Sequence, residues 1–286
     1  MSAIHKQFSG APASQRAGRI ELADISIHLP GKQRFEAVRN ITTTIAAGEF
    51  ISIIGPSGCG KSTLLNAVAG YLAPSSGRLR VDGEAIDAPG PDRGMVFQHH
   101  SLLPWLSALD NVAFGLKMSG VGRRERLARA EEFLHLVGLG GFADRYPAQL
   151  SGGMQQRVEI ARVLINDPRV VLMDEPFGAL DAQTRERMQQ LLLGIWGRLK
   201  PTVLFVTHDI DEALILSDRV LVMTHRPGRI REEIIVDLPR PRPEDIIVSP
   251  EFIALKKRCL ALVQDEVRQS LIGGLEAARI ELPVEA

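Results

Sequence analysis

The stretch Gly55-Pro56-Ser57-Gly58-Cys59-Gly60-Lys61-Ser62 decides the fold, because it follows a short apolar strand pattern (49–54) and opens a helical pattern (61–69). It matches G-x-x-x-x-G-K-[ST], a loop whose glycines let backbone N–H groups turn inward and form a nest for anions. The helix that follows adds the positive end of its dipole. Strand, glycine loop and helix together predict the opening of a nucleotide-binding α/β unit. The competing interpretation is a glycine turn before a purely structural helix, which this context disfavours.

The loop side chains suit the phosphates of a nucleotide. Lys61 supplies a point charge for the β- and γ-phosphates, Ser62 offers a hydroxyl ligand for Mg²⁺, and Thr63 lies toward the α-phosphate. Cys59 is interpreted as a small residue that fits the loop, with a redox role as the minor alternative. The expected nucleotide-binding residues of this region are Gly55, Pro56, Ser57, Gly58, Cys59, Gly60, Lys61, Ser62 and Thr63.

Two carboxylates follow the apolar strand pattern at 170–173. The carboxyl ends of strands in an α/β sheet are where such sheets bind ligands. We expect Asp174 to hold the Mg²⁺ shell, and Glu175 to orient and polarise a water that attacks the γ-phosphate. An ordinary acidic loop is the alternative, and the phosphate loop upstream makes it the weaker one.

The charge balance, the cysteine count and the length of the apolar runs exclude several classes of protein. The chain has 286 residues, 34 Lys and Arg against 34 Asp and Glu, and two cysteines. The balanced charge leaves no electrostatic footprint for nucleic acid or anionic lipid. Two distant cysteines exclude a disulfide framework, which favours a reducing compartment. No apolar run reaches the roughly 18 residues of a membrane span. We therefore expect a soluble, globular protein that is not integral to a membrane.

Short strands alternating with helices predict an α/β fold with a mostly parallel central sheet. The alternation at 19–29 is strand-like with a slip between Leu22 and Ile25. A helical stretch between the strands at 94–97 and 170–173 predicts an inserted helical subdomain. The expected organisation is a disordered tail (1–18), a main domain (19–237), and a linker with a C-terminal helix (238–286). Helices are expected at 61–69, 123–137, 154–165, 183–199 and 250–272.

Leu150-Ser151-Gly152-Gly153-Met154 resembles the LSGGQ signature of ATP-binding cassette (ABC) ATPases, with Met154 in place of the last Gln. Three further elements stand in the family's order. Gln98 resembles the Q-loop glutamine, Gly178–Asp181 the D-loop, and His208 the switch histidine. The resemblance covers 19–237 and implies a P-loop NTPase fold, with an N-terminal antiparallel β subdomain and with 98–165 forming the Q-loop and the helical signature subdomain.

The resemblance also implies an enzyme that works as a head-to-tail homodimer with two ATP molecules at its interface. Each ATP would lie between the phosphate loop of one subunit and Ser151, Gly152 and Gly153 of the other. His208 would bond the γ-phosphate, Gln98 would sense Mg²⁺ and the attacking water, and Asp181 would link the two sites. The implied catalytic residues are Glu175, His208, Gln98 and Lys61, and the implied Mg²⁺ ligands are Ser62, Gln98 and Asp174.

A finer resemblance rests on Leu102–Trp105, Asp110–Val112, Asp174–Asp181 and Thr207–Ala213, which are similar to nitrate, taurine and aliphatic-sulfonate importers. It implies a peripheral subunit at the cytoplasmic face of the bacterial inner membrane, which powers a separate permease supplied by an external solute-binding protein. The solute stays open. The alternatives are a soluble ABC ATPase of repair or ribosome function and a catalytically silent paralogue. Intact Lys61, Glu175 and His208 disfavour the silent paralogue.

Several assignments stay open at this point. Phe35 is the preferred residue for stacking on adenine, with His28 as the alternative. Trp105 is either a core residue or, with Leu103 and Pro104, a contact for the permease. Met154 should change nucleotide affinity rather than abolish function. The C-terminal helix could regulate, dimerise or cap the domain.

Overall fold

The computed structural model describes residues 18–30, 35–98 and 101–280, so all but Gly18 of the expected tail lies outside the described residues. The chain divides into two compact units. The first contains residues up to Ile20, Ile45–Glu49 and Ala88–Leu204, and the second contains Glu21–Thr44, Phe50–Asp87 and Phe205–Ala286.

An antiparallel β subdomain belongs to the second unit. Strands β1 (Ile20–Leu29), β2 (Phe35–Ile45), β4 (Ser76–Val81) and β5 (Glu84–Ala85) form a sheet in the order β2-β1-β4-β5. The slip in the β1 pattern has a physical cause. Asp24 has a φ of 55°, and its N–H donates to the Thr42 hydroxyl at 2.9 Å, so the alternation restarts after it.

A second group of strands in this unit carries the phosphate loop. Strand β3 (Phe50–Ile54) is buried at every position and pairs in parallel with β9 (Arg219–Met223). Strand β10 (Ile230–Ile235) adds to β9 in antiparallel orientation. Helix α2 (Lys61–Ala69) follows the loop and ends at Gly70, which has a φ of 84°, as the sequence predicts. Helix α7 (Ile210–Leu216) also belongs here.

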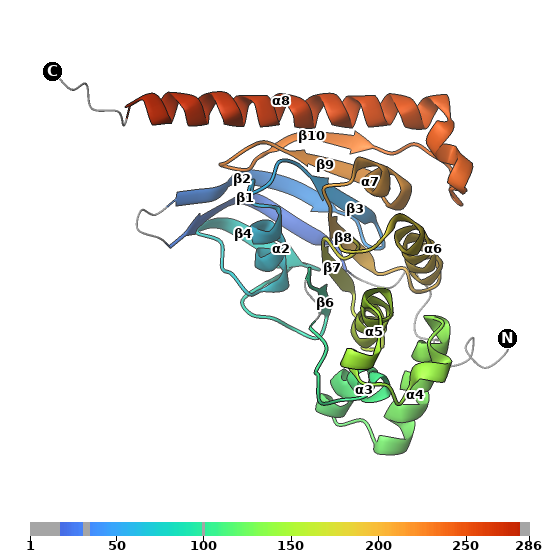
Figure 1. Ribbon diagram of the computed structural model, residues 1–286. Helices are drawn as coiled ribbons and strands as arrows, with labels where there is room; N and C mark the ends of the chain where they lie inside the picture. The colour runs from blue at the N-terminus through green and yellow to red at the C-terminus, as the bar shows by residue number, and fades with distance from the viewer. Residues whose placement is uncertain (1–17, 31–34, 99–100, 281–286) are drawn as a thin grey trace. The chain divides into compact units, whose positions relative to one another are not determined.

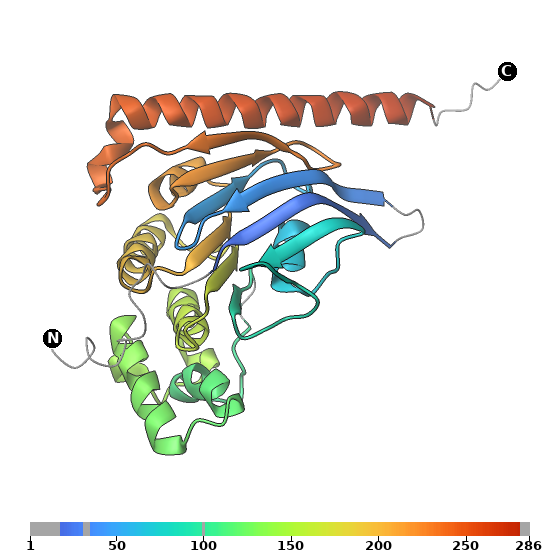
Figure 2. The same ribbon diagram turned by 180° about the vertical axis from the view of Figure 1, so that it is seen from behind.

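Helix α8 (Pro250–Ile280) runs along β10, as Figures 1 and 2 show. Its Phe252 and Cys259 are fully buried in an apolar cluster with Ile234 and Val236 of the strand region. The preceding segment, 238–243, is the predicted linker, yet Leu238 and Arg242 within it are buried. A 3₁₀ turn at Glu244–Val248 leads into the helix. The C-terminal extension therefore contributes to the core of the second unit.

The first unit holds the helical subdomain. Helices α3 (Ala108–Met118), α4 (Arg123–Leu136) and α5 (Gly152–Leu164) pack together, with 3₁₀ turns at Gly140–Phe142 and Pro147–Gln149 (Figure 1). Strands β6 (Arg93–Val96) and β7 (Val170–Asp174) pair in parallel. Helix α6 (Ala182–Leu199) leads to β8 (Thr202–Val206), which crosses the boundary between the units. Parallel pairs, the antiparallel sheet and the inserted helices confirm the expected fold class.

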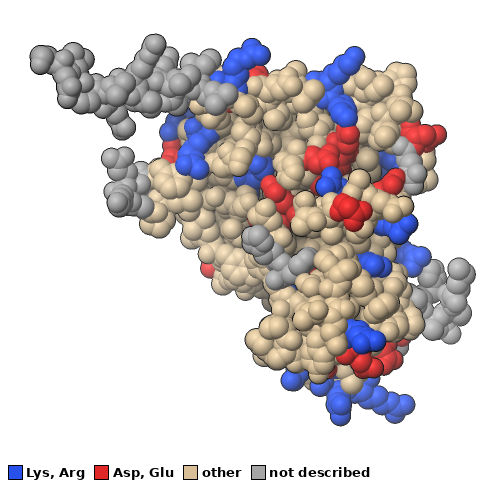
Figure 3. Space-filling model, in the orientation of Figure 1, with Lys and Arg blue, Asp and Glu red and all other residues tan. Residues whose placement is uncertain are grey.

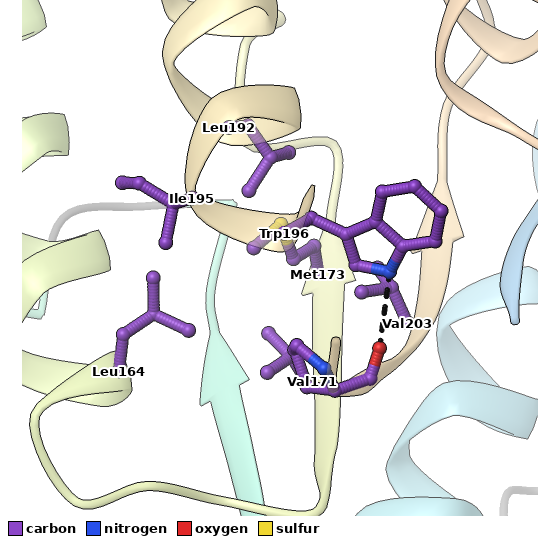
Figure 4. Close-up of a pocket in the computed structure, with 8 residues that line it drawn as sticks. Leu164, Val171, Met173, Leu192, Ile195, Trp196 and Val203 are labelled. Atoms are coloured by element: carbon purple, nitrogen blue, oxygen red, sulfur yellow. Dashed lines mark hydrogen bonds between the residues drawn. The ribbon is translucent and has the colours of Figure 1, made fainter. Parts of the chain in front are cut away.

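A small apolar pocket lies between α5, α6, β7 and β8 (Figure 4). The indole N–H of Trp196 donates to the Pro201 carbonyl at 3.1 Å, so the polar atom of this side chain is already bonded. The pocket therefore belongs to the core rather than to a ligand site. Its lining is Leu164, Val171, Met173, Leu192, Ile195, Trp196, Pro201 and Val203. Within the described part of the chain, no helix is both long and apolar enough to span a membrane.

Candidate nucleotide-binding site

The phosphate loop requires glycine at two of its turns. Gly58 and Gly60 have φ values of 72° and 102°, which side chains rarely allow. A Cβ on Gly60 would also lie 2.7 Å from the Ala37 carbonyl oxygen of β2. Gly60 is the N-cap of α2 and offers no side chain there, so the backbone forms the rim of the loop. The glycines of the motif thus serve both the turn and the close approach of β2.

The Lys61 side chain folds back over the loop and is 7% exposed. Its Nζ donates to the carbonyls of Gly55 at 3.0 Å and Pro56 at 2.9 Å. Beside it the Cys59 thiol is buried, and this burial raises its pKa above the ordinary value. A buried, protonated thiol disfavours a redox role and fits the interpretation of Cys59 as a small filling residue.

The aromatic candidate Phe35 begins β2, and the guanidinium of Arg226 lies over its ring at 4.8 Å from the centroid. The alternative, His28, lies in β1, where its backbone N–H donates to the Ser75 hydroxyl at 3.0 Å. Arg226 also donates to the Gly58 carbonyl of the phosphate loop. Sequence reasoning missed Arg226, because 168 residues separate it from the loop.

The carboxylate pair ends β7 in the first unit. Met173 is fully buried, and Glu175 has a φ of 44°, an uncommon conformation for a residue with a side chain. The Gln98 amide Nε2 donates to Glu175 Oε2 at 3.3 Å. Two predicted site residues that stand 77 positions apart are therefore in direct contact. Strain of this kind is frequent at functional sites, where surrounding structure holds it in place.

The signature segment begins α5. Ser151 is its N-cap, and the hydroxyl accepts from the Met154 N–H at 3.4 Å. The helix begins at Gly152, two residues before the expected start, because Gly152 and Gly153 form its first turn. A Cβ on Gly153 would lie 2.8 Å from Thr184 Cγ2, so glycine permits the close packing of α5 on α6.

Asp181 of the D-loop caps α6. Its carboxylate accepts from the Thr184 N–H at 3.0 Å, and this bond holds the pKa of Asp181 below its ordinary value. The side chain thus has a structural partner within its own unit.

A buried carboxylate supports the segment that follows Gln98. Glu159 of α5 is fully buried and accepts from the N–H and the hydroxyl of Ser101, at 3.3 and 2.5 Å. Arg162 donates to the Ser101 carbonyl at 2.9 Å. The signature helix is therefore bonded to the Q-loop segment. Nothing in the sequence pattern marked these residues, because each is an ordinary member of a helix or loop.

His208 lies between β8 and α7 and is exposed. Its neighbours hold the turn: Thr207 donates to Glu212 Oε2 at 2.6 Å, and Asp209 caps α7 by accepting from the Glu212 N–H at 3.1 Å. These hydrogen bonds hold the backbone on both sides of His208, whose side chain is exposed.

Asn111 of α3, which is fully buried, organises the loop that carries Trp105. Its Nδ2 donates to the carbonyls of Leu103 at 3.1 Å and Leu106 at 3.0 Å, and its Oδ1 accepts from the Leu103 N–H at 2.8 Å. Trp105 is 70% exposed, so the core alternative for this residue is wrong. The tight loop holds its side chain out into solvent.

The predicted site residues form two sets, one in each unit. The phosphate loop, Phe35 and His208 belong to the second unit, and the carboxylates, Gln98, the signature segment and Asp181 belong to the first. No group of three or more His, Cys, Asp or Glu that could hold a metal occurs among the described residues. The expected ligands Ser62, Gln98 and Asp174 all offer oxygen, which fits a hard cation such as Mg²⁺ bound together with phosphates.

Known proteins resemble this chain over most of its length. The family model for ABC transporter matches residues 38–178. The taurine import ATP-binding protein of Rhizobium johnstonii is 52% identical over 79% of this chain and 88% of its own length. The nitrate import ATP-binding protein of Synechocystis is 46% identical over 86% and 95%.

A solved dimeric ATP-binding cassette in a post-hydrolysis state with ADP and Pi is also similar. It has 35% identity and a TM-score of 0.69, and the match covers 77% of this chain and all of that one. The fold is that of a P-loop NTPase, and the chain belongs to the ABC transporter family as an ATP-binding, ATP-hydrolysing subunit.

Proposed function

We propose that the chain powers import of a small solute, such as nitrate, taurine or another sulfonate, through a separate membrane permease. The observation that carries the proposal is the similarity, over about four-fifths of the chain or more, to ATPases named for taurine and nitrate import. An external solute-binding protein would deliver the cargo, and this subunit would sit at the cytoplasmic face of the membrane.

The proposed hydrolytic roles follow the chemistry of each group. Lys61 binds the β- and γ-phosphates, and Glu175, oriented by Gln98 at 3.3 Å, accepts the proton of the attacking water. His208 bonds the γ-phosphate. Ser62, Gln98 and Asp174 would hold Mg²⁺, and the cation would supply positive charge opposite the phosphate oxygens.

We further propose a homodimer, because the signature segment would complete the site of a second copy. The start of α5, with Ser151, Gly152 and Gly153, offers backbone N–H groups suited to a γ-phosphate. Asp181 would lie near this interface. A dimeric cassette among the similar structures supports the arrangement.

The proposed contact with the permease centres on Leu103, Pro104 and Trp105. Backbone bonds from Ala108 to Arg145 at 2.7 Å and from Leu109 to Ala143 at 2.9 Å bring a second loop to the end of this segment. Aromatic side chains on that loop are also exposed, Phe142 at 42% and Tyr146 at 48%. Exposed aromatic groups of this kind favour a protein partner. Figure 3 shows acidic and basic side chains interspersed on the face that it draws, as the zero net charge suggests.

Replacing Trp105 by Ala tests the docking. We expect Trp105→Ala to lose co-purification with the permease while basal ATP hydrolysis stays near the parent rate. Met118→Ala is the matched control, because Met118 of α3 is likewise 70% exposed. The control should retain both properties. Recovery of the permease with Trp105→Ala at the parent level would contradict the docking proposal.

The identity of the solute is tested separately, on the external binding protein that would deliver it. Thermal-shift measurements of that protein with nitrate, taurine and alkanesulfonates should show stabilisation by one of these solutes, since a ligand bound only to the native state raises the melting temperature. No shift with any of them would contradict the proposed solute class.

A further inference from the structure

The turn between β9 and β10 places one side chain across two parts of the nucleotide site. Arg226 donates to the Gly58 carbonyl of the phosphate loop through Nε at 3.2 Å and Nη2 at 3.0 Å. The same guanidinium covers the Phe35 ring, 4.8 Å from its centroid. Arg226 therefore joins the phosphate loop to the aromatic candidate for the adenine base.

The bond to Gly58 has a consequence for the loop. The Gly58 carbonyl and the Cys59 N–H belong to one planar trans peptide, so they point in opposite directions. With the carbonyl directed at Arg226, the Cys59 N–H points into the loop, where it donates to the Pro56 carbonyl at 3.4 Å. Arg226 thus holds a peptide of the phosphate loop whose N–H closes the turn onto the Pro56 carbonyl.

The turn between β9 and β10 packs closely against the phosphate loop and β2. The Gly228 N–H donates to the Ala37 carbonyl, and the Arg39 N–H donates to the Gly228 carbonyl, both at 2.9 Å. A Cβ on Gly228 would lie 2.0 Å from the Cys59 carbonyl oxygen, so no side chain fits there. The turn packs directly on the backbone of the phosphate loop and of β2.

Helix α8 anchors this turn through Glu266, which is 3% exposed. Glu266 Oε2 accepts from the His225 backbone N–H and contacts its Nδ1, both at 2.9 Å. Glu266 Oε1 accepts from Arg231, on the other side of the turn. One buried carboxylate of the C-terminal helix therefore holds both sides of the turn that carries Arg226.

We propose that Arg226 is a positioning residue for nucleotide binding and that Glu266 of α8 fixes it in place. Its role is to hold the phosphate loop and the Phe35 ring in the arrangement that receives ATP. The C-terminal helix thereby affects nucleotide affinity without contacting the nucleotide. This inference rests on the proposed assignment of the loop and Phe35 to ATP.

Steady-state hydrolysis and calorimetric ATP binding, measured on the full chain, test the inference. Arg226→Ala should raise KM and Kd for ATP about five- to tenfold and leave kcat within about twofold. Arg226→Lys keeps the charge but lacks the planar fork, so it should restore affinity only in part. Arg229→Ala removes another exposed arginine of the same turn and should match the parent protein.

Glu266→Gln tests the anchor. It should raise KM in the same direction, and combining it with Arg226→Ala should add little, because both changes act on one contact. Arg226 is exposed, so its variants remain informative if Glu266→Gln folds poorly.

An unchanged KM and Kd in Arg226→Ala would overturn the inference, as would a loss of kcat at unchanged KM. Either result, with a parent protein that hydrolyses ATP, leaves the proposed function standing. A parent chain that neither binds nor hydrolyses ATP would overturn both.

Discussion

Replacing the buried Arg242 by Ala should destabilise the second unit strongly. Arg242 is 4% exposed, and burial lowers its pKa to about 10, which leaves it charged at neutral pH. Its guanidinium binds the backbone carbonyls at the C-terminal end of α7 and in the segment that follows β10. It donates to five backbone carbonyls: Leu214 at 2.8 Å, Ile215 at 3.0 Å, Ser217 at 2.7 Å, Val236 at 3.2 Å and Leu238 at 3.2 Å.

The magnitude follows from these bonds. Each hydrogen bond from a charged donor contributes about 1.5–3 kcal/mol, but the values are not additive, and burying the ion offsets part of them. Arg242→Ala leaves buried backbone carbonyls without their donor at about 1–3 kcal/mol each, and partial rehydration offsets part of this cost, so a total of about 3–5 kcal/mol is expected. In a chain of this size 1 kcal/mol lowers the melting temperature by roughly 2 °C, so Arg242→Ala should melt about 6–10 °C below the parent.

Thermal melting followed by circular dichroism measures the effect, with Arg258→Ala as control. Arg258 lies on α8 and pairs with Glu232, but its side chain is 57% exposed. An exposed ion pair contributes at most about 1 kcal/mol, so this variant should shift the melting temperature by no more than about 2 °C. Arg242→Lys should fall between the two, because one ammonium cannot reach all the carbonyls. If Arg242→Ala melts within error of Arg258→Ala, the reasoning is refuted.

Three further outcomes are expected. Glu175→Gln should bind ATP but hydrolyse it at least about 100-fold more slowly, because an amide cannot accept the proton; phosphate release at the parent rate would contradict this. At pH 7 the Asp181 cap contributes stability to α6, so Asp181→Ala should melt below the parent protein. Because the folded pKa of Asp181 is depressed, that contribution is complete above its unfolded pKa of about 4 and disappears as the pH falls through the lower folded value. The difference in melting temperature between the parent protein and Asp181→Ala should therefore shrink at low pH. A difference at pH 3 as large as that at pH 7 would argue against the cap. Cys59 and Cys259 are buried with raised pKa values, that of Cys259 at about 11, so iodoacetamide should label the native protein far more slowly than the unfolded chain; equal labelling rates would contradict the buried placement.

Elements with a strong local pattern could be predicted from the sequence. Helix α2 has the expected bounds, and the fully buried β3 and β8 are apolar except for Ser52 and Thr202. Strand β10 was missed, because Arg231, Glu232 and Glu233 interrupt its apolar pattern. Helix α7 was missed because its seven residues are too few to show a helical period.

The candidate site likewise has one part that could be predicted from the sequence and one part that could not. The phosphate loop was predictable because its conformation depends on glycines within eight consecutive residues. The hydrogen bonds that hold the site in place were not predictable, since they join residues that are far apart in the sequence and belong to no motif. Glu159 contacts Ser101 across 58 positions, and His225 contacts Glu266 across 41. Periodicity and motif spacing carry no information on such pairs.

The C-terminal helix illustrates what such long-range contacts change. From the sequence it could regulate, dimerise or cap the domain. Phe252 and Cys259 are fully buried against Ile234 and Val236, so the first half of α8 completes an apolar core and caps the unit. A fully buried side chain of the size of Phe252 stabilises a fold by about 1.5–3 kcal/mol, so removing the helix would expose a core rather than detach an appendage. Because Glu266 extends this packed surface to the turn that contacts the phosphate loop, capping and regulation need not be alternatives: the contacts that cap the unit also determine the position of Arg226.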